Sequence, residues 1–257
     1  ISCSLVGSEM CIRDREKTAK GFTFHTKGGD FYATKCIMAT GGKTLKKSGS
    51  DGSGFLYLES LGHHIIDLVP GLIGLKGKQS FFADIAGIRA DVKVDLYIES
   101  THVCSEQGEL QLTNYGISGI PVFQLSRVAT RALSEQKKVY ATLNFVPLWE
   151  KEQCLTYFKE RFKKADEKHI GEALIGFFPE KLIPVLLEES HIKAAKYANR
   201  LQTEELERFI DTVQGLRVDI TDWNTFDTAQ VTAGGVDTDE ILSLIHISEP
   251  TRLQLIS

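Results

Sequence analysis

A chain of 257 residues with 42% hydrophobic and 25% charged residues has the composition of an ordinary folded protein with one or two globular domains. Its formal net charge of -4 argues against a basic surface for nucleic acid. The apolar run near the C-terminus, residues 242–247, is too short to span a membrane.

Both ends of the sequence resemble translated sequencing adapter. Residues 242–252, L-S-L-I-H-I-S-E-P-T-R, are what one strand of a transposase sequencing adapter encodes, and residues 5–15 read from its reverse complement in another frame. We therefore predict that residues 1–15 and 242–257 are adapter-derived and non-native. The remaining chain is then an internal fragment of a longer protein.

The genuine segment begins with a predicted β-hairpin. Residues 21–26 and 30–34 alternate around Lys27, Gly28 and Gly29, a pattern typical of two antiparallel strands and a tight turn. An apolar run, Cys36 to Ala39, then predicts a buried strand that ends at Gly41 and Gly42. After a Gly/Ser loop, residues 54–61 predict a short helix that Gly62 ends. Strand, glycine turn, loop and helix in this order are typical of a nucleotide-binding site.

A β-rich region follows, with a helix inside it. Strands are predicted at 65–68, 72–75, 91–98, 109–113 and 139–145, and again at 216–220 and 229–232. Between them, Ser118 is predicted to cap a helix that has Pro121 in its first turn and runs to about Glu135. The free N–H groups at the start of that helix could face an anion or a carbonyl group, or the helix could simply pack on a sheet.

Residues 149–214 change in character to charged, helical sequence. Apolar residues recur at helical spacing, and Pro179 and Pro184 are predicted to divide the block into short helices. We interpret it as a helical insertion in the β-rich domain. Cys36, Cys104 and Cys154 have no metal-ligand spacing, and such scattered thiols suit a reducing, cytoplasmic environment.

Three motifs in the same order carry a family resemblance: A-T-G-G at 39–42, G-I-S-G at 116–119 and V-T-A-G-G-V at 231–236. This succession resembles the bacterial BaiN/RdsA family of NAD(P)/FAD-dependent oxidoreductases, which includes aminoacetone oxidase relatives. The resemblance covers residues 16–241. It implies an α+β fold in which 16–63 end a Rossmann-like FAD domain, 64–148 with 215–236 form a β-rich, barrel-like domain, and 149–214 are the helical insertion.

The resemblance also implies the cofactor and the residues near it. FAD is expected, with NAD(P)H as a possible partner, a small-molecule substrate, and neither nucleic acid nor membrane as partner. The implied FAD contacts are Ala39, Thr40, Gly41, Gly42, Gly52, Ser53 and Gly54, and the implied contacts to the flavin or substrate are Thr232, Gly234, Gly235 and Val236. A turn needed only for folding is an equal interpretation of the second set.

Some expected parts of such a protein are missing from the sequence. It has no G-x-G-x-x-G turn opening a βαβ unit, so we predict that the fragment does not retain FAD and is inactive. Asp51 lies two residues before the acidic position of the family's T-G-D-G motif, where this chain has Ser53. No catalytic residue and no metal site is predicted. A non-catalytic β-plus-helix binding module and a fumarate-reductase-like flavoprotein remain alternatives.

Overall fold

The structure is a computed structural model that describes residues 12–240. The adapter prediction for 1–11 and 242–257 therefore lies outside the described residues, and for 12–15 it stays a prediction. The chain divides into two compact units, Ile1–Thr40 and Gly41–Ser257, which we describe one at a time.

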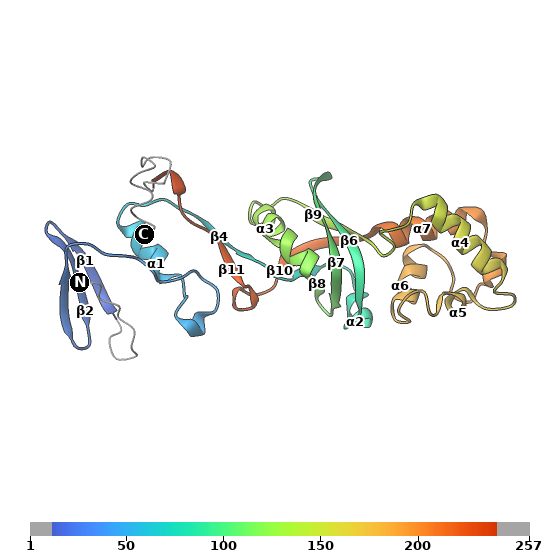
Figure 1. Ribbon diagram of the computed structural model, residues 1–257, viewed down its shortest axis with the longest axis horizontal. Helices are drawn as coiled ribbons and strands as arrows, with labels where there is room; N and C mark the ends of the chain where they lie inside the picture. The colour runs from blue at the N-terminus through green and yellow to red at the C-terminus, as the bar shows by residue number, and fades with distance from the viewer. Residues whose placement is uncertain (1–11, 241–257) are drawn as a thin grey trace, which may run out of the picture. The chain divides into compact units, whose positions relative to one another are not determined.

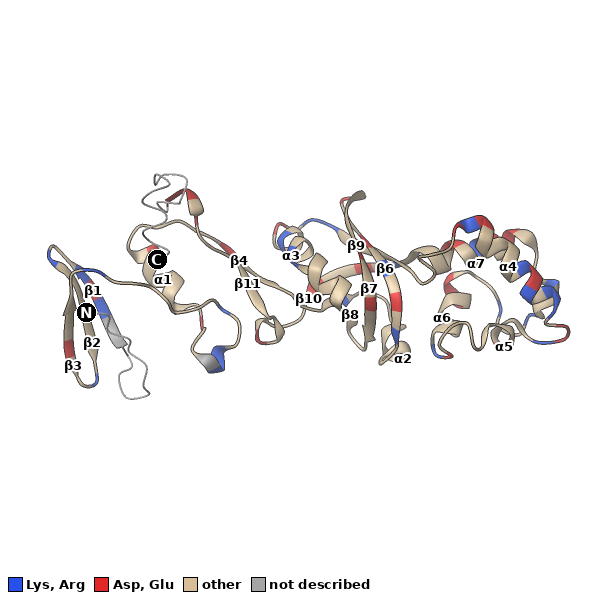
Figure 2. Cartoon of the chain, viewed as in Figure 1, with Lys and Arg blue, Asp and Glu red and all other residues tan. Residues whose placement is uncertain are grey.

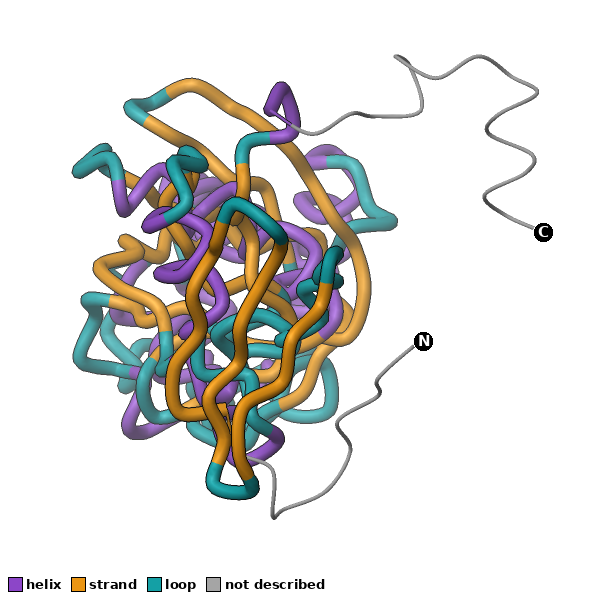
Figure 3. Tube along the Cα trace, turned by 90° about the vertical axis from the view of Figure 1, so that its left-hand side faces the viewer, coloured by secondary structure: helices purple, strands orange, loops and turns teal. Residues whose placement is uncertain are grey.

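The first unit is a three-stranded antiparallel sheet in the order β1 (Ile12–Thr18), β2 (Gly21–Thr26), β3 (Gly29–Ala33). Figure 3 shows these strands running side by side. In the turn between β2 and β3, the Thr26 hydroxyl donates to the Gly29 carbonyl oxygen at 2.9 Å and accepts the Gly28 N–H at 3.1 Å. The predicted hairpin is confirmed.

The predicted buried strand at Cys36 to Ala39 is wrong. These residues form no strand, and the Ile37 side chain is 92% exposed. A strand that is buried on both faces needs hydrogen-bonded neighbours and covering helices, and no strand of the described residues pairs with this segment. Within the described chain, Cys36 and Met38 are only partly buried, and no strand or helix covers the segment on both faces.

The second unit starts with a helix and a two-stranded ribbon (Figure 1). Helix α1 (Ser53–Ser60) ends in a Schellman motif: the Gly62 N–H donates to the Glu59 carbonyl oxygen, and the His63 N–H donates to the Leu58 carbonyl oxygen. Gly62 has φ 95°, which confirms the predicted helix stop. The ribbon pairs β4 (Ile65–Gly71) with β11 (Val231–Val236) in antiparallel register.

A closed six-stranded barrel forms the centre of this unit, with the strand order β10-β5-β8-β7-β6-β9. All of its pairings are antiparallel. Alternate residues of β6 are buried, as the sequence pattern predicts. Its strands are β5 (Leu75–Gly77), β6 (Arg89–Ile98), β7 (Thr101–Thr113), β8 (Gly116–Gly119), β9 (Val139–Asn144) and β10 (Leu216–Trp223).

Two details of the predicted β-rich region are corrected. The strand expected at 72–75 does not form, because Leu72 has φ 51° and bends the chain between β4 and the short β5. Ser118 is not a helix cap: it lies in β8, where it pairs with Gln111 of β7, and Gly119 holds the N-cap position of α3 (Ile120–Ser134). Pro121 is in the first turn of α3, as predicted.

Four α-helices fill the chain between β9 and β10: α4 (Lys151–Lys163), α5 (Ile170–Leu174), α6 (Leu182–Glu189) and α7 (Thr203–Gly215). Pro184 does not break the chain into separate helices, because it lies in the first turn of α6, where a missing N–H costs nothing. The remaining helical elements are short. They are the α-helix α2 (Phe82–Ile85) and the 3₁₀ helices η1 (Lys46–Ser48), η2 (Ala198–Arg200), η3 (Phe226–Thr228) and η4 (Thr238–Glu240).

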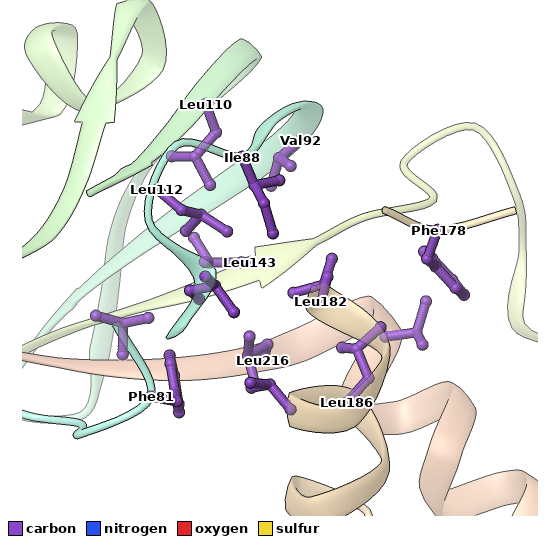
Figure 4. Packing of buried hydrophobic residues seen from close by; sticks show 14 of the residues in the cluster. Phe81, Ile88, Val92, Leu110, Leu112, Leu143, Phe178, Leu182, Leu186 and Leu216 are labelled. Carbon is purple, nitrogen blue, oxygen red and sulfur yellow. The ribbon is translucent and has the colours of Figure 1, made fainter. Parts of the chain in front are cut away.

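The barrel and the helices share one hydrophobic core. Figure 4 shows Leu143 and Leu216 of the barrel close to Leu182 and Leu186 of α6. Further along the helices, the Phe158 ring lies edge-on to the Phe209 ring at 5.6 Å. The expectation of a mixed fold with a β-barrel and helices is thus confirmed, whereas the Rossmann-like part stays a prediction. Within residues 12–240, no helix is long and apolar enough to cross a membrane.

Candidate functional site

Sequence-distant glycine and threonine motifs meet where α1 joins the β4–β11 ribbon. The Lys43 N–H donates to the Thr232 hydroxyl oxygen at 2.8 Å, across 189 positions of sequence. The Gly52 N–H donates to the Gly42 carbonyl oxygen at 3.0 Å, which closes the loop before α1. We call this junction, formed by residues 41–54 and 231–236, the glycine junction.

Two glycines of the glycine junction are required by close packing. A Cβ atom on Gly42 would lie 2.5 Å from the Thr232 hydroxyl oxygen and 2.9 Å from its Cβ. Gly234 forms a bulge in β11 with φ 97°, and a Cβ atom there would lie 2.3 Å from the Asp67 carbonyl oxygen. Packing within the chain therefore accounts for both glycines without a ligand.

The start of α1 explains the role of Asp51. Its carboxylate oxygen accepts the Ser53 N–H at 2.9 Å, so this acid supports the helix start from a position two residues before Ser53. A negative charge at this place also favours the positive end of the helix. This role was not predicted, because Asp51 stands two residues before the acidic position of the family's motif.

The structure brings most of the predicted site residues together. Those in the glycine junction come from the loop, from α1 and from β11: Gly41, Gly42, Gly52, Ser53, Gly54, Thr232, Gly234, Gly235 and Val236. Ala39 and Thr40 are exposed and end the other compact unit. The A-T-G-G motif is thus divided between the two units.

A pocket of about 520 Å³ opens beside the glycine junction. Phe55 and Trp223 give it apolar walls, and among residues 12–240 Lys43 is its one basic lining residue. Its acidic lining residues are Asp51, Glu59 and Asp67. Three carboxylates against one ammonium group disfavour a pyrophosphate, so this pocket does not fit the phosphates of a dinucleotide. Its apolar walls suit a flat or aliphatic group instead.

The start of α3 has no side-chain cap. Gly119 has φ 103° and closely approaches β7, where a Cβ atom would lie 2.4 Å from the Glu109 carbonyl oxygen. Tyr115, just before β8, packs over Gly74. A Cβ atom on Gly74 would lie 2.6 Å from the Tyr115 hydroxyl oxygen. Both contacts are explained by packing of the barrel.

Two adjacent histidines pair with acids at the end of the ribbon. His63 Nδ1 lies 3.0 Å from a Glu240 carboxylate oxygen, and His64 Nδ1 lies 3.4 Å from an Asp237 carboxylate oxygen. The Asp239 N–H and His64 lower the pKa of Asp237. These contacts hold the last described turn, η4, against the start of β4.

The described residues contain no cluster of three or more His, Cys, Asp or Glu side chains that could hold a metal ion. Cys36, Cys104 and Cys154 are free thiols. Burial raises the pKa of the Cys104 and Cys154 thiols, which keeps them protonated and poorly reactive near neutral pH.

Comparison with known proteins identifies the family. The protein family described as "HI0933-like protein barrel and H2TH domain" matches residues 69–231. This range begins in β4, ends in β11, and contains the barrel and the four helices. The chain belongs to the HI0933-like family. This membership supports the flavoprotein resemblance of the three motifs, and the HI0933-like match places the closed barrel among the family's own features.

Curated relatives of this HI0933-like chain include enzymes. It is 42% identical over 224 residues to the 3-dehydro-bile acid delta(4,6)-reductase of Clostridium scindens, covering 87% of this chain and 55% of that protein. It is 24% identical to the ribosomal RNA dihydrouridine synthases of Escherichia coli and Haemophilus influenzae, covering 88% and 90% of this chain and 54% of each of them. The chain therefore spans about half the length of the curated relatives it matches.

Proposed function

We propose that this chain is the barrel-and-helix portion of an FAD-dependent oxidoreductase that transfers hydride between a small organic substrate and the flavin. The observation that carries the proposal is membership of the HI0933-like family together with 42% identity to a reductase. Reduction of an organic substrate needs a hydride source, which a flavin supplies when it is bound. NAD(P)H is the proposed source of the flavin's electrons.

The glycine junction is the proposed flavin-facing part of the chain. Gly41 and Gly42 would lie beside the FAD, and Gly52, Ser53 and Gly54 would lie near its nucleotide portion. The residues that would approach the flavin or the substrate are Thr232, Gly234, Gly235 and Val236. Ala39 and Thr40 are also proposed to lie beside the FAD. The carboxylates of the neighbouring pocket do not fit the pyrophosphate, so we propose that residues beyond those described hold it, and that this chain by itself does not retain FAD.

A small organic substrate is proposed in preference to RNA. Identity to the bile acid reductase is higher than identity to the ribosomal RNA synthases. The net charge of -4 would also oppose a polyanionic substrate.

The test compares this chain with a longer reading frame recovered from flanking DNA. Both proteins are purified, mixed with FAD and desalted, and their flavin absorbance is measured before and after NAD(P)H is added. We expect the longer protein to be yellow and to bleach with NAD(P)H, and the 257-residue chain to be colourless. A longer protein that takes up no FAD would refute the proposal and favour a non-catalytic binding module.

A further inference from the structure

A second pocket, of about 410 Å³, is lined mainly by α3, the turn after it, and β11. It shares no lining residue with the pocket beside the glycine junction. Its lining combines three basic side chains, Arg127, Arg131 and Lys137, with Glu135 and with apolar and glycine residues. Figure 2 shows basic residues on α3 and in the turn after it. We call it the arginine pocket.

The two arginines of the arginine pocket are on one face of a helix. Arg127 and Arg131 are one turn apart on α3, a spacing that puts two side chains next to each other. Arg127 stands against the ribbon: its Cβ would be 4.0 Å from a Cβ atom on Gly71 of β4. Two like charges at this spacing repel each other unless an anion lies between them.

Among the described residues, neither guanidinium group has a direct polar partner, and the positive charge of Arg131 interacts with Glu135 only at longer range. Among residues 12–240, no hydrogen bond or ion pair engages the side chain of Arg127 or Arg131. Glu135, an acidic residue of the pocket lining, forms an ion pair with Lys137, whose ammonium nitrogen lies 2.6 Å from a carboxylate oxygen. The pocket thus has a net positive charge within a chain of net charge -4.

The remaining lining explains the shape of a ligand that would fit. Ile98, Val128 and Ala132 provide an apolar surface from the barrel and from α3. On the opposite side the pocket is lined by Ala233 and the bulged, exposed Gly234, which has no side chain to fill the space. A ligand there would have an anionic head at the arginines and an apolar body on the pocket wall.

We propose that the arginine pocket binds an organic oxyanion. A carboxylate or phosphate head would accept paired hydrogen bonds from Arg127 and Arg131, because the planar guanidinium group matches the geometry of both. The apolar body of the same molecule would lie against Val128 and Ala132. The site shares Ala233 and Gly234 with the glycine junction, but its two arginines would bind an anion without flavin, so the proposal does not rest on the proposed function.

Binding is tested with three probes on the full chain: octanoate, octyl phosphate and inorganic phosphate. Each is titrated into ¹⁵N-labelled protein, and the amide shifts of Ala233 and Gly234 are followed. We expect saturable shifts with an octyl probe and weaker binding of inorganic phosphate. A preference for octanoate or for octyl phosphate identifies the head as carboxylate or phosphate. No saturable shift with any probe, or equal binding of inorganic phosphate, would overturn the proposal.

Variants separate the arginines from general charge. Arg127→Gln and Arg131→Gln are each expected to weaken binding about tenfold or more, and Arg131→Lys should weaken it less because the charge remains. Arg89→Gln is the matched control, since Arg89 is an exposed arginine on the barrel that pairs with Glu109. Circular dichroism checks that each variant is folded. Equal affinities of the Arg89 and Arg131 glutamine variants would contradict the assignment.

Discussion

Replacing Gly42 by alanine tests the packing that joins the two ends of the second unit. The new Cβ would lie 2.5 Å from the Thr232 hydroxyl oxygen and 2.9 Å from its Cβ, well inside van der Waals contact. Rotation about χ1 moves the hydroxyl and methyl groups of Thr232 but not its Cβ, so the backbone must also shift. Such overpacking costs about 1 to 3 kcal/mol. Loss of the bond from the Lys43 N–H adds about 0.5 to 1.5 kcal/mol, so the expected total is about 1.5 to 4.5 kcal/mol.

The free energy of unfolding is measured by urea denaturation, and amide hydrogen exchange of Lys43 is the local measurement. Gly215→Ala is the control, because a Cβ atom there meets nothing within 4 Å at the end of α7. It should be neutral or stabilising by up to about 1 kcal/mol.

A second variant shows whether Thr232 is the residue that clashes. Gly42→Ala combined with Thr232→Gly removes both clashing atoms, so the double variant should cost at least about 1 kcal/mol less than the sum of the two single variants. The reasoning is refuted if Gly42→Ala costs less than about 0.5 kcal/mol with unchanged exchange at Lys43, or if the two substitutions are additive.

Two further predictions concern the helices. Phe158→Ala should lower the free energy of unfolding, measured by urea denaturation, by about 3 to 5 kcal/mol, because the ring is fully buried. Leu148→Ala is the control: its side chain is 82% exposed, so the free energy of unfolding should change by less than about 0.5 kcal/mol. Similar costs of the two substitutions would contradict the shared core. The Lys196 ammonium, and then the Gln202 N–H, lower the pKa of Glu205 in the folded protein. The ionised Glu205 carboxylate therefore stabilises the fold above its unfolded-state pKa, and this contribution is lost as the pH falls through the folded-state pKa. Glu205→Gln should therefore be less stable than the wild type at neutral pH, and the two urea midpoints should converge in acid; a constant difference would refute the linkage.

Sequence patterns correctly predicted those helices and strands whose formation depends on residues close to one another in the chain. The alternation over 91–98 and the Gly-Gly turn at 28–29 depend on neighbouring residues, and both lie where they were expected. The helical block likewise follows from its apolar spacing. Each of these elements buries one face that its own sequence specifies.

Other features depended on partners that the sequence does not reveal. Cys36 to Ala39 has the pattern of a buried strand, but a strand forms only beside another strand. Ser118 has the side chain of a helix cap, yet pairing with Gln111 keeps it in β8. The contact between Lys43 and Thr232 could be expected only from the family resemblance, because nothing local links positions so far apart.

The ribbon of β4 and β11 has a consequence for the connectivity of the whole unit. Gly71 and Val231 are direct partners in it, so the chain leaves for the barrel and returns from the helices through two neighbouring backbone positions. The barrel and the helices thus form one insertion whose two ends lie about 5 Å apart, the spacing of paired strands. Residues 72–230 are therefore suited to excision, or to transplantation into another surface hairpin, because joining such close ends needs only a short turn.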